Sequence, residues 1–167
     1  TLPLLFLCLA PRAHAFAPET THAGLTQEIL SYYSGYFKHS LSTTDKEFVI
    51  SGAIQEDEPP DRALNHFYDP VRGIGLHGQR TSIEWLTQTI DNRWSWPNSI
   101  AAYAKGDTET AFIGLGHALH LVEDAAVPDH TRNDPHIGDD AAGLNTGASP
   151  FEKWVSEHKN RSTLAGF

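Results

Sequence analysis

The chain has 167 residues and a formal net charge of −9, with 12 Lys and Arg against 21 Asp and Glu. This length fits one domain with a sizeable core, and 40% hydrophobic with 20% charged residues describes a globular protein. The acidic balance argues against a protein that holds nucleic acid by a broad basic surface, because such binding relies on Lys and Arg. Ten histidines accompany a single Cys and no Met, which suggests a hard or borderline metal ion.

The first fifteen residues have the pattern of a secretory signal peptide. An apolar run from Leu2 to Ala10 precedes Ala13-His14-Ala15, an ending that predicts cleavage after Ala15. The run is too short to span a bilayer. The mature chain, 16–167, would begin at Phe16 and contain no Cys, so we expect a secreted or periplasmic protein without disulfide bonds.

The rest of the chain is predicted to form one all-α domain, a helical bundle. Helical spacing of apolar residues, N-cap residues and helix-ending Pro and Gly residues place the helices. They are expected from Thr20 or Thr21 to about Phe37, from Asp45 to about Ala53, from Thr81 or Ser82 with Ile83, Leu86 and Ile90 on one face, from Pro97 to about Gly106, from Asp107 through Ala126, and from Pro150 or Phe151 onward. No segment alternates at period two, so no strand is predicted.

Two features of these segments bear on packing and function. In the first helix an apolar stripe is formed by Leu25, Ile29, Tyr32, Tyr33 and Tyr36. Between the second and third helices, residues 55–79 are rich in Pro, Gly and Asp, which predicts a long functional loop.

The strongest chemical pattern lies on the longest helix and just after it. His120 and Asp124 are four residues apart, so both side chains leave the same face, and His130 follows six residues later. An imidazole and a carboxylate one turn apart form a natural pair of metal ligands. A satisfied interior histidine and a helix-end carboxylate remain the alternative. His117, one turn earlier, is either a partner of the ligands or a surface residue.

Further candidate ligands lie elsewhere in the chain. The run Glu56-Asp57-Glu58 would usually be a solvated face, whereas His66 stands among aromatic residues in the long loop. Imidazole and carboxylate without thiolate suit catalytic zinc. The candidate ligands together are His22, Asp57, His66, His120, Asp124, His130 and Glu152.

The sequence resembles the zinc-dependent phospholipases C of bacteria and their relatives, the single-strand-specific nucleases. The resemblance is carried by His66-Phe67-Tyr68-Asp69-Pro70, by the H-x3-D-x5-H order from His120 to His130, and by a processed amino terminus followed by an early His. It covers most of the mature chain. It implies an all-α bundle that holds up to three zinc ions in a cleft.

The resemblance also implies an assignment of ligands to each ion. The first zinc would take Asp57, His66, His120 and Asp124, and the second would take His130 and Glu152. The third would take His22, Asp124 as a bridge, and the amino nitrogen and carbonyl oxygen of Phe16. Cleavage before Phe16 would therefore free a metal ligand.

The chain departs from the family pattern in three places. The family usually has Trp at the position of Phe16, although the metal would contact only backbone atoms there. Four residues before Glu152, where the family has a His, this chain has Ala148, and His136 is a candidate substitute. The family also continues well past this glutamate, so we expect a further carboxy-terminal portion beyond Phe167.

These features predict a phosphodiesterase of phospholipase C type that uses zinc-activated water. Asp57 is the candidate for the carboxylate that orients or deprotonates this water. Glu19 and Glu58 are candidates for contact with a cationic head group. The expected substrate is a phospholipid or other phosphodiester, with transient membrane contact, no stable nucleic-acid complex, and a monomeric enzyme. A nuclease of the same superfamily, with base stacking on Tyr68, Phe67 or the tryptophans near residue 95, and a non-catalytic zinc module remain alternatives.

Overall fold

The computed structural model describes residues 21–134, 151, 154 and 155, and within these residues the protein is all-α, as predicted. The helices are α1 (Ala23–Phe37), α2 (Thr43–Gln55), α3 (Ser82–Thr87), α4 (Trp96–Ala104) and α5 (Thr108–Asp124), with two 3-10 turns, η2 (Pro60–Asn65) and η3 (Leu76–Gly78). The described residues form no strand beyond one isolated bridge between Asp69 and Ile74. None of their helices has the length and apolar character needed to cross a membrane.

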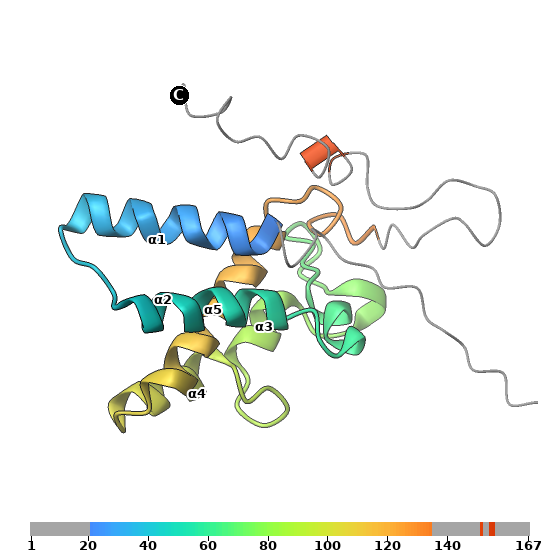
Figure 1. Cartoon of the computed structure of the whole chain (residues 1–167). Helices are drawn as coiled ribbons and strands as arrows, with labels where there is room; N and C mark the ends of the chain where they lie inside the picture. The colour runs from blue at the N-terminus through green and yellow to red at the C-terminus, as the bar shows by residue number, and fades with distance from the viewer. Residues whose placement is uncertain (1–20, 135–150, 152–153, 156–167) are drawn as a thin grey trace, which may run out of the picture.

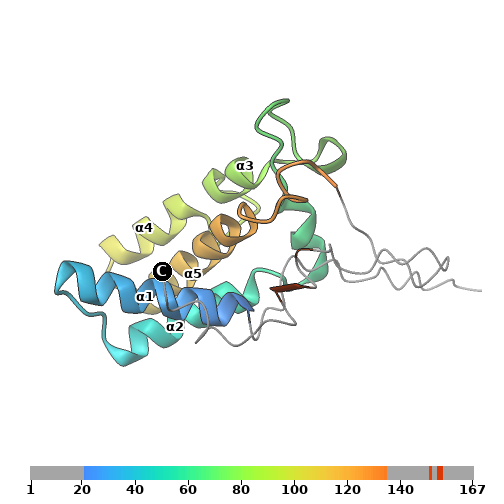
Figure 2. The ribbon, with the colours of Figure 1, turned by 90° about the horizontal axis from the view of Figure 1, so that it is seen from above.

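Helix α5 is the centre of the bundle. Figures 1 and 2 show α2 and α4 lying against different sides of α5, with α1 above α2, and the α2–α5 pair packs most extensively. The segment between α2 and α3 gathers near the carboxy-terminal end of α5. The ends of α1, α2 and α5 therefore meet the long loop in one region.

Glycines allow α2 and α5 to touch backbone to backbone. A Cβ atom on Gly116 would lie 2.0 Å from the carbonyl oxygen of Val49, and one on Gly52 would lie 2.0 Å from that of Ile113. On the side facing α4, a Cβ on Gly114 would lie 1.8 Å from the Ser99 hydroxyl. Hydrogen atoms at these positions thus set the separation of α5 from both neighbours.

Most predicted helix starts agree with the structure. Asp107 caps α5 by accepting a hydrogen bond from the Thr110 amide at 3.1 Å. Thr81 and Glu84 form a capping box at the start of α3. Helix α2 begins earlier than predicted, because Ser42 accepts a hydrogen bond from the Asp45 amide.

Other predicted boundaries differ from the structure. Helix α3 ends at Thr87, since Gln88 is extended, and Ile90 is 89% exposed rather than part of a helical face. The predicted loop at 55–79 contains the two 3-10 turns. Of the predicted last helix only residues 151, 154 and 155 are described, and all three are helical. The predicted signal peptide lies outside the described residues.

The apolar stripe of α1 is largely on the surface. Tyr32 and Tyr36 are 69% and 67% exposed, whereas Thr26 and Leu30 are buried. Helix α1 is held mainly at its amino-terminal end, where Leu25 packs on Val127. Polar contacts at the same end, described below, bring α1 to the functional site.

The glycine contact predicts a stability difference between two Gly→Ala substitutions. Gly116→Ala should lower the free energy of unfolding by about 1–3 kcal/mol, because the methyl group pushes α2 away from α5. Gly35→Ala is the matched control: nothing lies within 4 Å of its Cβ, so higher helix propensity should stabilise the protein by up to about 1 kcal/mol. Urea unfolding of both variants measures the difference, and equal stabilities would contradict the proposed contact.

Candidate metal centre

Six of the predicted ligands converge at the carboxy-terminal end of α5. Each is at most 3% exposed. They come from the residue before α1, the segment after α2, the long loop, the last turns of α5 and the turn that follows it; they are His22, Asp57, His66, His120, Asp124 and His130. Two overlapping triads, His22–Asp57–His120 and His66–His120–Asp124, place their ligand atoms within 4.8 Å of one another.

Asp124 is the centre of this group. Its Oδ1 lies 3.4 Å from Nε2 of His22, while its Oδ2 lies 2.8 Å from Nδ1 of His66 and 3.3 Å from Nε2 of His120. The same Oδ2 is 3.6 Å from Nδ1 of His130. Asp57 Oδ1 lies 3.7 Å from the same two ring nitrogens, Nδ1 of His66 and Nε2 of His120. The two carboxylates and the imidazoles thus face one point.

Hydrogen bonds from Nδ1 fix the orientation of three histidines, and in His22 and His120 this nitrogen is the one that lies away from Asp124. Nδ1 of His22 donates to Glu123 Oε2 at 2.7 Å, and Nδ1 of His120 donates to the Ala53 carbonyl at 2.6 Å. Nδ1 of His130 donates to the His66 carbonyl at 3.3 Å. A neutral ring with its proton on Nδ1 carries its lone pair on Nε2, and such partners are typical of metal-ligating histidines.

Several buried polar atoms at the centre have close ionic neighbours but make no well-oriented hydrogen bond with any of the described residues. They include Nε2 of His120, both ring nitrogens of His66 and both oxygens of Asp124. Native proteins satisfy the great majority of such atoms, so a cluster of exceptions at one point needs a ligand. A cation coordinated by nitrogen and oxygen atoms fits this donor set, which contains no thiolate.

The electrostatics of the metal-free centre are those of carboxylates paired with imidazolium groups. Burial alone would raise the pKa of Asp124, but the nearby His120 and His130 hold it well below the usual range. Burial alone would lower the pKa of His66, yet the Asp124 and Glu56 carboxylates raise it to about 10. The pKa of His120 is also raised, against burial, by Asp124. A metal ion that binds these nitrogens would therefore compete with protons.

The aromatic loop motif holds His130 in place. The Phe67 ring stacks on the His130 ring with centroids 4.2 Å apart, and the Tyr68 amide donates to the His130 carbonyl at 3.0 Å. Asp69 faces away from the ligands and accepts from the amides of Val71 and Arg72. In the segment His66 to Pro70, His66 is thus the candidate ligand, and the residues after it support His130 and the loop.

Glu56 is a buried carboxylate rather than part of a solvated face. It is fully buried and accepts from Trp85 Nε1 at 2.8 Å, from Arg62 Nη2 at 2.5 Å and from His117 Nδ1. Its Oε1 lies 3.5 Å from Nε2 of His66. Burial would raise the pKa of Glu56, but His117 and His66 keep it well below its ordinary value. His117 is therefore a buried partner of this network and not a surface residue.

Two residues at the centre were not identified from the sequence. Glu56 belongs to an acidic run of a kind that usually forms a solvated face, and nothing in the sequence singles out Glu123 beside Asp124. Their partners lie 61 and 101 residues away in the chain, so no local spacing could reveal them. The nearest signal is that both acids adjoin a predicted ligand.

The remaining predicted site residues are either exposed or not described. Glu58 is exposed and directly follows Asp57. The predicted ligands Phe16, His136 and Glu152, the predicted head-group contact Glu19, and Ala148 lie outside the described residues. The second zinc site implied by the resemblance stays a prediction.

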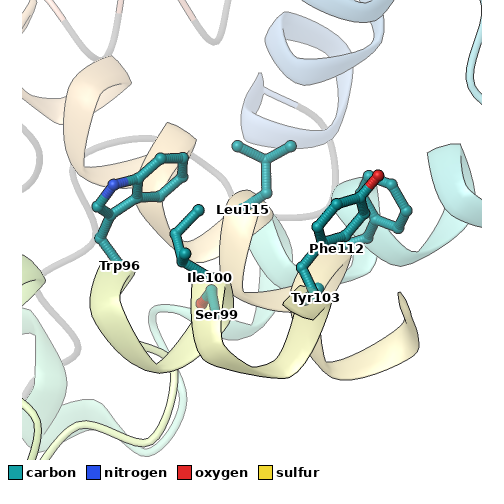
Figure 3. A pocket seen from close by; sticks show the side chains of 7 residues that line it. Trp96, Ser99, Ile100, Tyr103, Phe112 and Leu115 are labelled. Atoms are coloured by element: carbon teal, nitrogen blue, oxygen red, sulfur yellow. The ribbon is translucent and has the colours of Figure 1, made fainter. Parts of the chain in front are cut away.

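A separate hollow lies between α4 and the first half of α5. It has a volume of about 120 Å³ and is lined by Trp96, Ile100, Tyr103, Phe112 and Leu115, with Ser99 and Ala111 (Figure 3). This lining is almost wholly apolar and offers no metal ligand. The chemistry of the described residues is concentrated at the other end of α5.

Comparisons with protein-family models, curated proteins and solved structures find no match to this chain. The buried groups themselves therefore carry the functional argument: two overlapping His/Asp triads that could bind metal ions in an all-α protein.

The central position of Asp124 predicts its effect on metal content. Asp124→Asn keeps the size of the side chain but removes the negative charge that faces four imidazoles, so at least one bound ion should be lost. Asp69→Asn is the control, because an Asn oxygen can still accept from the amides of Val71 and Arg72. Zinc per protein, measured after dialysis, should fall only in Asp124→Asn. Equal zinc content in wild type and Asp124→Asn would exclude the central role of this carboxylate.

Proposed function

We propose that this protein is a secreted, zinc-dependent phosphodiesterase of phospholipase C type. The observation that carries the proposal is the convergence of His66, His120, Asp124 and His130, the residues of the two motifs in the family resemblance, on one buried point. Segments from distant parts of the chain supply them, and Nδ1 of His120 donates to the Ala53 carbonyl, as expected for a ligand whose Nε2 faces the ion.

Bound zinc would supply positive charge for the phosphate oxygens and lower the pKa of a bound water. Asp57 lies among the ligands with its carboxylate fully buried. In the proposed reaction it steers a water molecule and takes its proton as the water oxygen bonds to phosphorus. The phosphorus–oxygen bond to the leaving alcohol breaks, and the proton passes to that alcohol. The products are an alcohol and a phosphate monoester.

The chemistry of the surroundings favours a lipid head group over a nucleic acid base. Phe67 is buried against His130, and the half-buried Trp94 ring stacks on His117 at 5.2 Å between centroids, so one face of each ring is already occupied by a histidine. Glu58 is exposed beside Asp57 and offers negative charge to a cationic head group such as choline. A nuclease of the same superfamily is the alternative.

Parallel assays test the proposal. Zinc-loaded protein should hydrolyse phosphatidylcholine vesicles and cleave single-stranded DNA much more slowly. Asp57→Asn should lower the rate by about 10²–10⁴-fold, since it removes the proton acceptor. Asp61→Asn, an exposed neighbour on η2, is the control and should keep wild-type activity. Faster cleavage of DNA would support the nuclease, and a zinc-loaded protein inactive on both substrates would support a non-catalytic module.

The proposed export of the protein makes a prediction about its amino terminus. Secreted material should begin at Phe16, and the amine of Phe16 should be a metal ligand near His22. A protein with one Gly fused before Phe16 should therefore bind one zinc ion less tightly than the protein that begins at Phe16. Amino-terminal sequencing and zinc titration check the two parts; full affinity in the extended protein would remove Phe16 from the ligand set.

A further inference from the structure

Glu123 connects the start of α1 to the candidate metal centre. It is 6% exposed, and its two oxygens accept from different groups of one helix end: Oε2 from Nδ1 of His22 at 2.7 Å, and Oε1 from the Thr26 hydroxyl at 2.9 Å. Both partners are fully buried. The buried Glu123 carboxylate thus accepts hydrogen bonds from the His22 imidazole and the Thr26 hydroxyl, which lie one turn apart.

The same imidazole faces the centre with its other nitrogen. Nε2 of His22 lies 3.4 Å from Asp124 Oδ1, and the His22 ring stacks on the His120 ring with centroids 3.7 Å apart. Glu123, the His22 ring and Asp124 therefore form a line from the back of the ring to the centre. A carboxylate behind an imidazole fixes the tautomer and makes the ring a stronger ligand.

A simple mechanical role is the competing explanation. Glu123 could serve only to attach α1, whose outer face is exposed, to α5. The hydrogen bond from Thr26 fits that role equally well, whereas the bond from His22 would do more than attach the helix. The two bonds can be separated by mutation.

We propose that Glu123 is a positioning residue that holds His22 in its metal-binding orientation and strengthens it as a ligand. This inference rests on the proposed metal function of the centre. It assigns different roles to adjacent acids on α5: Asp124 faces the ion, and Glu123 acts through His22. The Thr26 bond steadies Glu123 and contributes to stability without contacting the ligand ring.

Two variants separate these roles. Glu123→Gln keeps the size and both hydrogen bonds, since the amide oxygen accepts from His22 and the amide NH₂ donates to Thr26 Oγ1, but it removes the charge. It should weaken zinc binding about 10–100-fold for one ion, with the melting temperature of the metal-free protein nearly unchanged. Thr26→Val should do the opposite: it should lower that melting temperature and change zinc affinity less than threefold.

A double-mutant cycle identifies the ion concerned. His22→Ala removes the ligand itself, so Glu123→Gln should have no further effect on zinc affinity in the His22→Ala background. Cobalt(II), used as a probe, should show a shifted visible spectrum in Glu123→Gln and a wild-type spectrum in Thr26→Val. A role confined to attaching α1 would leave the cobalt spectrum of Glu123→Gln unchanged.

The outcomes distinguish a failure of the proposed metal function from a failure of the role proposed for Glu123. If the wild-type protein binds neither zinc nor cobalt, the proposed metal function fails, and the role of Glu123 fails with it. If wild type binds metal and Glu123→Gln binds it with equal affinity, only the role of Glu123 is overturned. Additive losses from His22→Ala and Glu123→Gln would equally overturn it, because Glu123 would then act independently of His22.

Discussion

The contact between α2 and α5 at Gly52 and Gly116 is the constraint on which the candidate centre depends. A hydrogen in place of a methyl group lets the two backbones touch. That distance brings the Ala53 carbonyl to Nδ1 of His120 and places Asp57, just beyond the end of α2, among the ligands on α5. A larger side chain at Gly52 or Gly116 would therefore move Asp57 away from the ligands on α5, although it replaces no ligand itself.

The cost of burying so many ionisable groups explains why their partners are so numerous. An isolated buried charge is strongly unfavourable, and a buried ion pair is tolerated only when further hydrogen bonds satisfy its atoms. Around Glu56 those bonds come from Arg62, Trp85 and His117. Around the Asp124 carboxylate the part of the chain that the structure describes supplies imidazoles but no well-oriented hydrogen bond. The fold thus leaves one group of atoms poorly satisfied, as expected where binding a cation, rather than stability, determines the arrangement.

Features that depend on residues close together in the chain were predicted from the sequence. Four-residue spacing placed His120 and Asp124 on one face, and capping residues located the starts of α3 and α5. Pairings across 61 and 101 residues, such as Glu56 with His117 and Glu123 with His22, leave no trace in local spacing. The exposed stripe on α1 was unpredictable for the same reason, because apolar periodicity shows that a face exists and not whether another element covers it.

The helix ends make this point more favourable for a cation than for an anion. Helices α2 and α5 both direct their carboxy-terminal ends toward the centre, one ending at Gln55 before Asp57 and the other at Asp124. Partial negative charge at such ends favours cations nearby. Helix α1 presents its amino-terminal end instead, where a negative group is favourable, and Glu123 lies at that end. At the ends of α2 and α5, however, the carboxylates of Glu56 and Asp124 add to the negative charge of the helix end, so a cation offsets both. A proton on His66 and a metal ion both satisfy this field. Because the rear nitrogens of His22 and His120 are already bonded, the nitrogen of each ring that faces the centre is the one left to bind a metal ion.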